Sequence, residues 1–429
     1  MVVLVLLFFF LNSINLFALD VEEIVSERNI KAWVVEDKSV PIISMNLTFK
    51  GGAYFDPLNK EGTSTFVAAL LDEGAGNLNS KKFKEEMKDL GMKLDFRSSK
   101  DEFSISFQTI SKNKKKSFEL LRIALLEPRF DLEEVEKIRN QIISSIKIKE
   151  SNIQSFSSEQ FKKNFYLNHK FSRNVEGSLK SIKNIKKNDL EAYRNFFFTK
   201  SNLIIGISGD ISKSEVKKQL DLTFGDLPEG NIKDFFIKEI KKVRTGELKI
   251  KKKSPQTSVV FGHNGLDRTD EKYFAARIAN YVLGGGGFQS KLYKKIREEN
   301  GLVYSIYSYL LPNAAGGIIL GGFQTKNENV YTTLDLLKKE WLSIREKGIT
   351  QEELNNAKSY FIGSFSRSFS STKSIAALLN TVQTYKLGID YFDRRSKIIE
   401  DLTLSFVNKV CKDFFRPNEL FFTIVGDIS

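Results

Sequence analysis

The sequence predicts an α+β fold that is built twice, as two homologous domains related by internal duplication. Three pairs of similar segments carry this prediction, because all three keep the same order and nearly constant separation along the chain. Chance explains one such match but hardly three in register. The pairs are Asn202–Ser212 with Asn418–Ser429, Phe107–Thr109 with Phe323–Thr325, and Ser80–Lys84 with Ser290–Lys294.

Each half mixes strands with helices. Ile43–Phe49 and Phe103–Phe107 carry β-branched or aromatic residues at every second position, which is typical of half-buried strands. Helices are indicated where a capping residue precedes a glutamate by three positions. The candidate pairs are Asp131 with Glu134, Asn188 with Glu191, and Thr350 with Glu353. The hairpin-like spacing of the strands predicts, in each domain, a mostly antiparallel sheet packed with helices.

The 429 residues are enough for two domains with cores of their own. The predicted division has a leader at 1–18, an N-terminal domain at 19–230, a linker at 231–253 and a C-terminal domain at 254–429. The linker holds the densest lysine run of the chain, Lys233–Lys253. Charged runs of this kind rarely pack, so a solvated segment is expected there.

The N-terminus predicts export. Its apolar core, Val2–Leu11, is too short to span a membrane, and Ala18 offers a small residue for cleavage. No Lys or Arg precedes the apolar core. We expect a secretory signal peptide, a periplasmic location and no membrane span in the mature chain. The single cysteine, Cys411, excludes an internal disulfide and is expected in the core beside Val410.

Charge and histidine content exclude two classes of function. The formal net charge is +13, but the lysines are scattered and no nucleic-acid-binding motif is present, so no nucleic-acid partner is expected. The only two histidines are His169, expected in a loop, and His263, expected at the end of a strand. They lie in different halves and cannot form a metal pair at helical spacing, so structural roles are expected for both.

The segment Glu61–Leu71 resembles the metal-binding helix of the pitrilysin and insulinase-like zinc peptidases, in the branch of the mitochondrial processing peptidase. That family carries H-x-x-E-H, in which two histidines one turn apart bind zinc and the glutamate activates water. At the matching positions this chain has Thr65, Ala68 and Ala69. The family's third ligand is a later glutamate, and the matching stretch Ile142–Lys149 holds no carboxylate. The resemblance therefore implies a chain without a metal or cofactor of its own.

The second half keeps the family's other signature, within Leu283–Tyr309. In the family, an arginine and a tyrosine at this place lie across the cavity from the zinc, bind peptide and stabilise the developing oxyanion. The matching residues are Arg297 and Tyr304, which can supply charge-assisted and hydroxyl donors. The resemblance implies substrate binding by the glycine-rich loop, which consists of Gly284, Gly285, Gly286 and Gly287.

A purely structural interpretation of this pair stays open. Arg297 could pair at the surface with Glu298 or Glu299, and Tyr304 could pack between layers. Either arrangement would leave both residues without a role in catalysis.

Two functions follow from the resemblance. The first is a non-catalytic, substrate-binding subunit of a heterodimeric zinc metallopeptidase, whose zinc lies in a partner chain of the same family. Peptides would then be held extended along a sheet edge. The alternative is a peptide-binding or scaffold protein without hydrolytic activity. An independent protease is disfavoured by the lost metal motif, so no activity is expected of the chain alone.

Overall fold

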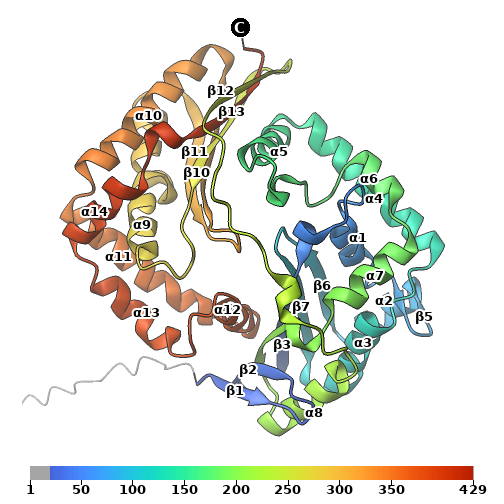
Figure 1. Cartoon of the computed structure of the whole chain (residues 1–429). Helices are drawn as coiled ribbons and strands as arrows, with labels where there is room; N and C mark the ends of the chain where they lie inside the picture. The colour runs from blue at the N-terminus through green and yellow to red at the C-terminus, as the bar shows by residue number, and fades with distance from the viewer. Residues whose placement is uncertain (1–19, 429) are drawn as a thin grey trace, which may run out of the picture.

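The computed structural model describes residues 20–428 and consists of two halves that each pack helices against one sheet (Figure 1). The predicted signal peptide lies outside the described residues. The N-terminal half runs from blue to green in Figure 1, and the C-terminal half from yellow to red. The predicted α+β class with mostly antiparallel sheets is confirmed.

The N-terminal sheet has the strand order β1-β2-β8-β3-β7-β6. β2 runs parallel to β8, and the other neighbours are antiparallel. The strands are β1 (Glu22–Val25), β2 (Lys31–Glu36), β3 (Ile42–Lys50), β6 (Lys93–Ser98), β7 (Glu102–Ile110) and β8 (Leu203–Gly209), with a separate short hairpin of β4 (Gly74–Ala75) and β5 (Leu78–Asn79).

The C-terminal sheet has the order β11-β12-β10-β13-β9. Its strands are β9 (Gly246–Lys251), β10 (Gln256–Asn264), β11 (Val303–Leu311), β12 (Ile318–Lys326) and β13 (Phe421–Gly426). Apart from the extra strand β1, this order repeats that of the first sheet, and β9 runs parallel to β13 as β2 does to β8. The repeated segments also lie on equivalent strands, β8 with β13 and β7 with β12. The internal duplication is therefore confirmed in the topology.

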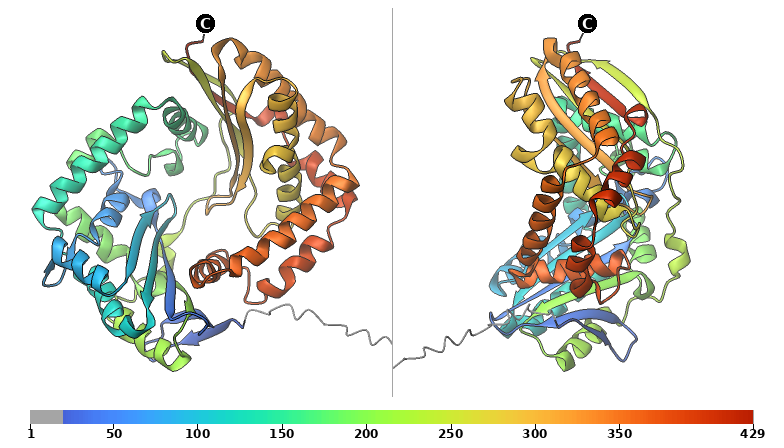
Figure 2. Two further views of the ribbon diagram at one scale, coloured as in Figure 1. Left: turned by 180° about the vertical axis from the view of Figure 1, so that it is seen from behind. Right: turned by 90° about the vertical axis from the view of Figure 1, so that its left-hand side faces the viewer.

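Both halves contain many helices, most of which cover the outer faces of the sheets (Figure 2). Those of the N-terminal half are α1 (Thr63–Leu70), α2 (Ser80–Asp89), α3 (Lys114–Leu126), α4 (Leu132–Ser151), α5 (Ile153–Phe165), α6 (Leu179–Asn184), α7 (Lys187–Phe197) and α8 (Lys213–Phe224). Those of the C-terminal half are α9 (Tyr273–Asn280), α10 (Val330–Lys347), α11 (Gln351–Phe365), α12 (Thr372–Thr384), α13 (Tyr391–Glu400) and α14 (Leu404–Phe414).

One of the three predicted capping boxes is confirmed. The Thr350 hydroxyl accepts from the Glu353 backbone N–H, and the Glu353 carboxylate accepts from the Thr350 N–H. The other two predictions are wrong. Asp131 precedes α4 without a side-chain cap, because its carboxylate accepts from Arg129 Nε at 2.7 Å. Helix α7 begins before Asn188, at Lys187.

The expected linker is partly structured. Gly246–Lys251 forms strand β9, so the second sheet begins before residue 254. Phe235 and Ile237 are also buried within the same segment. The sequence does not predict strand β9, because only two apolar residues, Leu248 and Ile250, alternate with its charged residues. This pattern is that of an edge strand with one exposed face. The expectation of a solvated linker is corrected for these parts.

The two halves exchange one helix each. Helix α5 lies on the inner face of the C-terminal sheet, where Phe161 and Phe165 contact Phe421 of β13. Helix α12 lies on the inner face of the N-terminal sheet, where Asn380 accepts from the Thr48 hydroxyl at 2.7 Å. Figure 1 shows α5 beside β10 and β13, and α12 beside β3. The inner face of each sheet is therefore covered by a helix of the other half.

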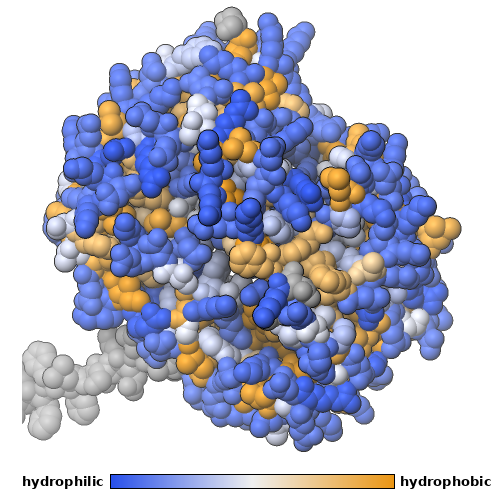
Figure 3. Space-filling view, in the orientation of Figure 1, coloured by the Kyte–Doolittle hydropathy of each residue, from blue (hydrophilic) through white to orange (hydrophobic). Residues whose placement is uncertain are grey.

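The surface in Figure 3 is mainly hydrophilic, with apolar residues scattered over both halves and gathered near the middle. Cys411 is buried in the core of the C-terminal half, as predicted. None of the helices in residues 20–428 combines the length and apolar character needed to cross a bilayer.

Candidate functional site

Helix α1 carries the degenerate metal motif and is packed as a core element. It contacts α4 and α7, and Ala68 joins the hydrophobic core at 6% exposure. Ala69 is half-buried, and the Thr65 hydroxyl donates to the Val175 carbonyl oxygen at 2.7 Å. The methyl groups of the two alanines and a hydroxyl that is already hydrogen-bonded cannot replace two imidazoles as metal ligands and a carboxylate as base.

The loop of residues 172–178 lies directly against the start of α1. Gly62 and Gly177 both have positive φ, +97° and +75°. A Cβ on Gly177 would stand 1.9 Å from the Glu61 carbonyl oxygen, and one on Gly62 would stand 2.5 Å from the Glu176 carbonyl oxygen. Only glycine allows this approach of two backbones. The Lys149 ammonium pairs with the Glu176 carboxylate and adds a further tie between α4 and the loop.

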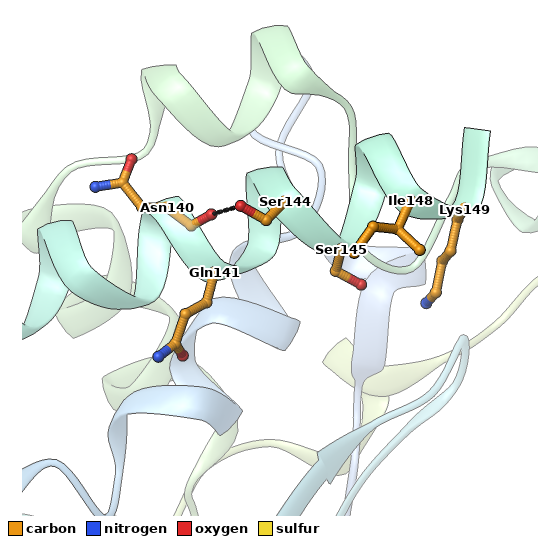
Figure 4. A pocket seen from close by; sticks show the side chains of 6 residues that line it. All are labelled: Asn140, Gln141, Ser144, Ser145, Ile148 and Lys149. Carbon is orange, nitrogen blue, oxygen red and sulfur yellow. Dashed lines mark hydrogen bonds between the residues drawn. The ribbon is translucent and has the colours of Figure 1, made fainter. Parts of the chain in front are cut away.

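The stretch Ile142–Lys149 of helix α4 supplies no carboxylate toward α1. Ile142 and Ile146 are buried on the side of the core, at 8% and 3% exposure. The opposite face of α4 is polar and forms a shallow depression (Figure 4). Its lining consists of Asn140, Gln141, Ser144, Ser145, Ile148 and Lys149. Because Ile142–Lys149 holds no carboxylate, this stretch contacts α1 through apolar side chains.

A cavity of about 890 Å³ opens beside α1. Thr65 and Ile146 lie in its wall, together with one face of α5, the turn after β6 and the loop 172–178. All of its lining residues belong to the N-terminal half. Arg297, Tyr304 and the glycine-rich loop do not line it, so this cavity holds only the N-terminal part of the predicted site.

The cavity is rich in charge. Burial lowers the pKa of Lys100 to about 7, and its ammonium donates to the carbonyl oxygens of Phe171 and Arg173. Burial raises the pKa of Glu159, whose carboxylate accepts from the Asn174 amide at 3.0 Å. Sequence reasoning missed these groups because they come from separate segments with no shared spacing.

The glycine-rich loop contacts strand β11. It spans the end of a π-helical turn, η6 (Tyr281–Gly285), and the start of a 3-10 turn, η7 (Gly287–Gln289). A Cβ on Gly284 would stand 2.4 Å from the Ser308 hydroxyl oxygen and 3.0 Å from the Ser308 backbone nitrogen. Gly287, by contrast, has φ +59° and open space around it. The first glycine therefore has a packing role, and the last lies where a ligand can reach it.

Arg297 and Tyr304 lie together at the surface. Arg297 belongs to the helical segment η8 (Tyr293–Glu298), and its guanidinium lies 5.0 Å from the ring centroid of Tyr304. Tyr304 is 83% exposed, next to an irregularity in the pairing of β11 with β12. Glu299 pairs with Lys295, at 2.7 Å. The structural alternative in which Tyr304 packs between layers is therefore wrong.

Neither histidine belongs to a metal site. His169 precedes a short 3-10 turn, and its Nε2 donates to the Lys238 carbonyl oxygen at 3.0 Å. His263 lies near the end of β10, fully buried, and its Nδ1 donates to the Asn264 carbonyl oxygen. Burial lowers the pKa of His263 to about 4 and keeps it neutral. Within residues 20–428, no three His, Cys, Asp or Glu side chains cluster as a metal would require.

Comparison with known proteins places both halves in one family. The family described as insulinase (peptidase family M16) matches residues 32–178, and the peptidase M16 inactive domain matches residues 184–361. The "Non-peptidase homolog YmxG" of Helicobacter pylori is 26% identical over 94% of this chain and 93% of its own length. The "Uncharacterized zinc protease YmxG" of Bacillus subtilis is 24% identical over 81% of this chain and 84% of its own length.

More distant relatives and solved structures agree with this placement. The "Mitochondrial-processing peptidase subunit beta" of Caenorhabditis elegans is 18% identical over 68% of this chain and 65% of its own length. A crystal structure of a peptidase M16 inactive domain from Pseudomonas fluorescens is 25% identical and superposes with a TM-score of 0.90, covering 95% of this chain and 98% of the other. The two family matches and the shared fold show that this chain belongs to peptidase family M16.

Proposed function

We propose that this chain is the non-catalytic, substrate-binding subunit of a heterodimeric zinc peptidase. The observation that carries the proposal is the Arg297–Tyr304 pair, stacked at 5.0 Å with Tyr304 exposed and Arg297 half-buried, while helix α1 offers no ligand. A pair of donors directed to the surface is available to a site on another chain. The name of the Caenorhabditis elegans relative, a subunit of a processing peptidase, also supports a two-chain assembly.

The geometry suits stabilisation of developing negative charge. Arg297 supplies charge-assisted donors, and stacking on Tyr304 and on Tyr293, 4.9 Å away, limits its motion. The Tyr304 hydroxyl is an additional donor that can face a scissile carbonyl. Zinc, held by the partner, would supply the activated water. The residues of α1 in this chain do not fit the metal and take no part in the proposed hydrolysis.

Location and cofactor complete the proposal. The leader at 1–18 would direct the chain to the periplasm, where a zinc-bearing partner of the same family is expected. This chain would carry no metal, because Thr65, Ala68 and Ala69 replace the ligands and the base.

The second candidate is a peptide-binding or scaffold protein without a hydrolytic partner. The observation that favours it is the packing role of Gly284 against Ser308, which gives part of the glycine-rich loop a purely structural reason. The name of the Helicobacter pylori relative, a non-peptidase homolog, is compatible with either candidate.

The test compares heterodimers reconstituted with an M16 chain that carries an intact H-x-x-E-H motif, at matched zinc content. Removing one oxyanion donor typically costs about 100- to 1000-fold in turnover, so Arg297→Ala and Tyr304→Phe should each cut peptide hydrolysis sharply. Arg297→Lys should rescue only partly, because lysine lacks the planar fork. Arg367→Ala and Tyr360→Phe, at other exposed positions, serve as controls. Wild-type turnover by both site variants, with normal assembly, would support the scaffold instead.

A further inference from the structure

We propose that the cavity beside α1 binds a carboxylate of an extended peptide, through the Lys162 ammonium and hydroxyl groups on the same face of α5. This inference rests on the proposed function, in which the chain holds peptides, and it names the chemical group that is recognised. The shared chemistry admits two sources, a peptide's C-terminal carboxylate or an Asp or Glu side chain.

Helix α5 has one face buried in a core and one face on the cavity. Phe161 and Phe165 are fully buried against the C-terminal sheet, and the Ser157 hydroxyl hydrogen-bonds with that of Ser258 on β10 at 2.7 Å. The opposite face turns to the cavity and is polar. The residues of α5 that line the cavity are Gln154, Ser155, Ser158, Glu159, Gln160, Lys162 and Lys163. Because its apolar face is anchored in a core, α5 presents these polar groups from a fixed wall.

Three of the cations that line the cavity already have partners. Lys149 pairs with Glu176, Lys100 donates to two carbonyl oxygens, and the Arg173 guanidinium donates to the Asp56 carbonyl oxygen at 2.9 Å. These cations have little left to offer a ligand. They hold the loop 172–178 and the turn after β6 in place around the opening.

The free donors are on α5. In the described part of the chain, Lys162 forms no ion pair within 4.0 Å and no side-chain hydrogen bond, and the hydroxyls of Ser155 and Ser158 form none either. Ser158 and Lys162 stand one helical turn apart and therefore on one side of the helix. Free donors gathered on one side of a helix suit a ligand that is rich in acceptors.

The electrostatic setting favours an anion. The Lys162 side chain is exposed, but the surrounding protein partly desolvates its ammonium and lowers its pKa, so a carboxylate that pairs with it recovers part of the lost solvation. The carboxylates of Glu159 and Glu176 also act on Lys162, but Asn174 already bonds the first and Lys149 pairs with the second. The volume of about 890 Å³ lies within the range of small-ligand pockets and admits only a few residues of a peptide.

The experiment titrates the full chain against fluorescein-labelled ten-residue peptides of one neutral sequence and follows fluorescence anisotropy. Three forms separate the sources of the carboxylate. They are a free C-terminus, an amidated C-terminus, and an amidated C-terminus with one internal glutamate. At least one carboxylate-bearing form should bind about tenfold or more tightly than the plain amide, as expected for a charge-assisted hydrogen bond. Preference for the free terminus or for internal glutamate identifies the source.

Lys162→Met retains the apolar stem and removes the charge. It should reduce binding of the preferred form to the level of the plain amide, leave the plain amide unchanged, and Lys162→Arg should restore the preference. Lys218→Met, at an exposed position of α8, makes the same change in net charge and should have no effect. Thermal melting confirms that all variants are folded.

The outcomes separate this inference from the proposed function. Equal binding of all three peptides, or a preference that survives Lys162→Met, overturns carboxylate recognition while peptide binding stands. If no peptide binds in any form, both carboxylate recognition and a peptide-holding role fail. A reconstituted heterodimer that cleaves peptides without any carboxylate preference leaves the proposed function intact and removes only the inference.

Discussion

Replacing Gly206 with alanine should separate the helix α12 from the N-terminal sheet. Gly206 lies in β8, where its backbone faces α12. An added Cβ would stand 2.4 Å from the Ala376 carbonyl oxygen and 2.8 Å from the Asn380 backbone nitrogen. Both neighbours are helix backbone, so no flexible side chain can move aside.

The magnitude follows from what the retreat of α12 would break. Ordinary contact needs about 3.5 Å, so the helix must move by roughly 1 Å. Asn380 accepts from the Thr48 hydroxyl at 2.7 Å and donates to the carbonyl oxygens of Ile204 at 3.0 Å and Asn46 at 3.2 Å. A shift of that size weakens all three bonds. Overpacking of about 1–3 kcal/mol and about 1 kcal/mol for each of the three weakened bonds give an expected loss of about 4–6 kcal/mol.

Equilibrium unfolding in urea, followed by circular dichroism, measures the loss. Gly363→Ala in α11 is the matched control, because an added Cβ there meets no heavy atom within 4 Å. In a helix that change should stabilise slightly, by about 0.5–1 kcal/mol. If Gly206→Ala unfolds at the wild-type urea concentration, the close packing of α12 on β8 is refuted.

Three further predictions concern other sites. Burial raises the pKa of Glu102 to about 7, with Asp101 adding to the effect, so the folded state retains a proton that the unfolded state loses. The wild type should therefore lose stability as pH rises from about 4.5 to 7, and urea midpoints of Glu102→Gln should show a smaller fall. Gly284→Ala should lower stability by about 1–3 kcal/mol through its clash with Ser308, whereas Gly287→Ala, at φ +59°, should cost about 1 kcal/mol in thermal melts. Introducing H-x-x-E-H on α1 should give neither tight zinc binding, by metal analysis, nor peptide cleavage, because α4 offers no third carboxylate.

The duplication was predictable because it left matching segments in the sequence, and those segments lie on equivalent strands. For the candidate site, a motif predicts only local placement. Thr65 lies on a helix, α1, and Arg297 and Tyr304 are adjacent in space as their spacing across one helix–strand junction implies. Local patterns of this kind depend on few residues and can be recognised without knowledge of tertiary contacts.

Features that depend on distant contacts could not be predicted. Strand β9 has only two apolar residues among charges, and its pairing with β13 becomes evident only once the sheet is assembled. The same holds for Asp131, whose carboxylate binds Arg129 instead of capping α4. Lys100 and Lys162 line the same cavity but come from separate segments, and their spacing in the sequence does not indicate that they lie close together.

The exchange of α5 and α12 has a consequence for the order of events on the ribosome. The apolar face of α5 is complete once residue 165 has been made, but its contact Phe421 lies on the last strand of the chain. The inner face of the first sheet likewise waits for Thr372–Thr384. A growing chain therefore carries the uncovered apolar face of α5 until synthesis is almost finished, and such a surface invites aggregation. Neither half is a unit that can finish folding while the other is still being translated.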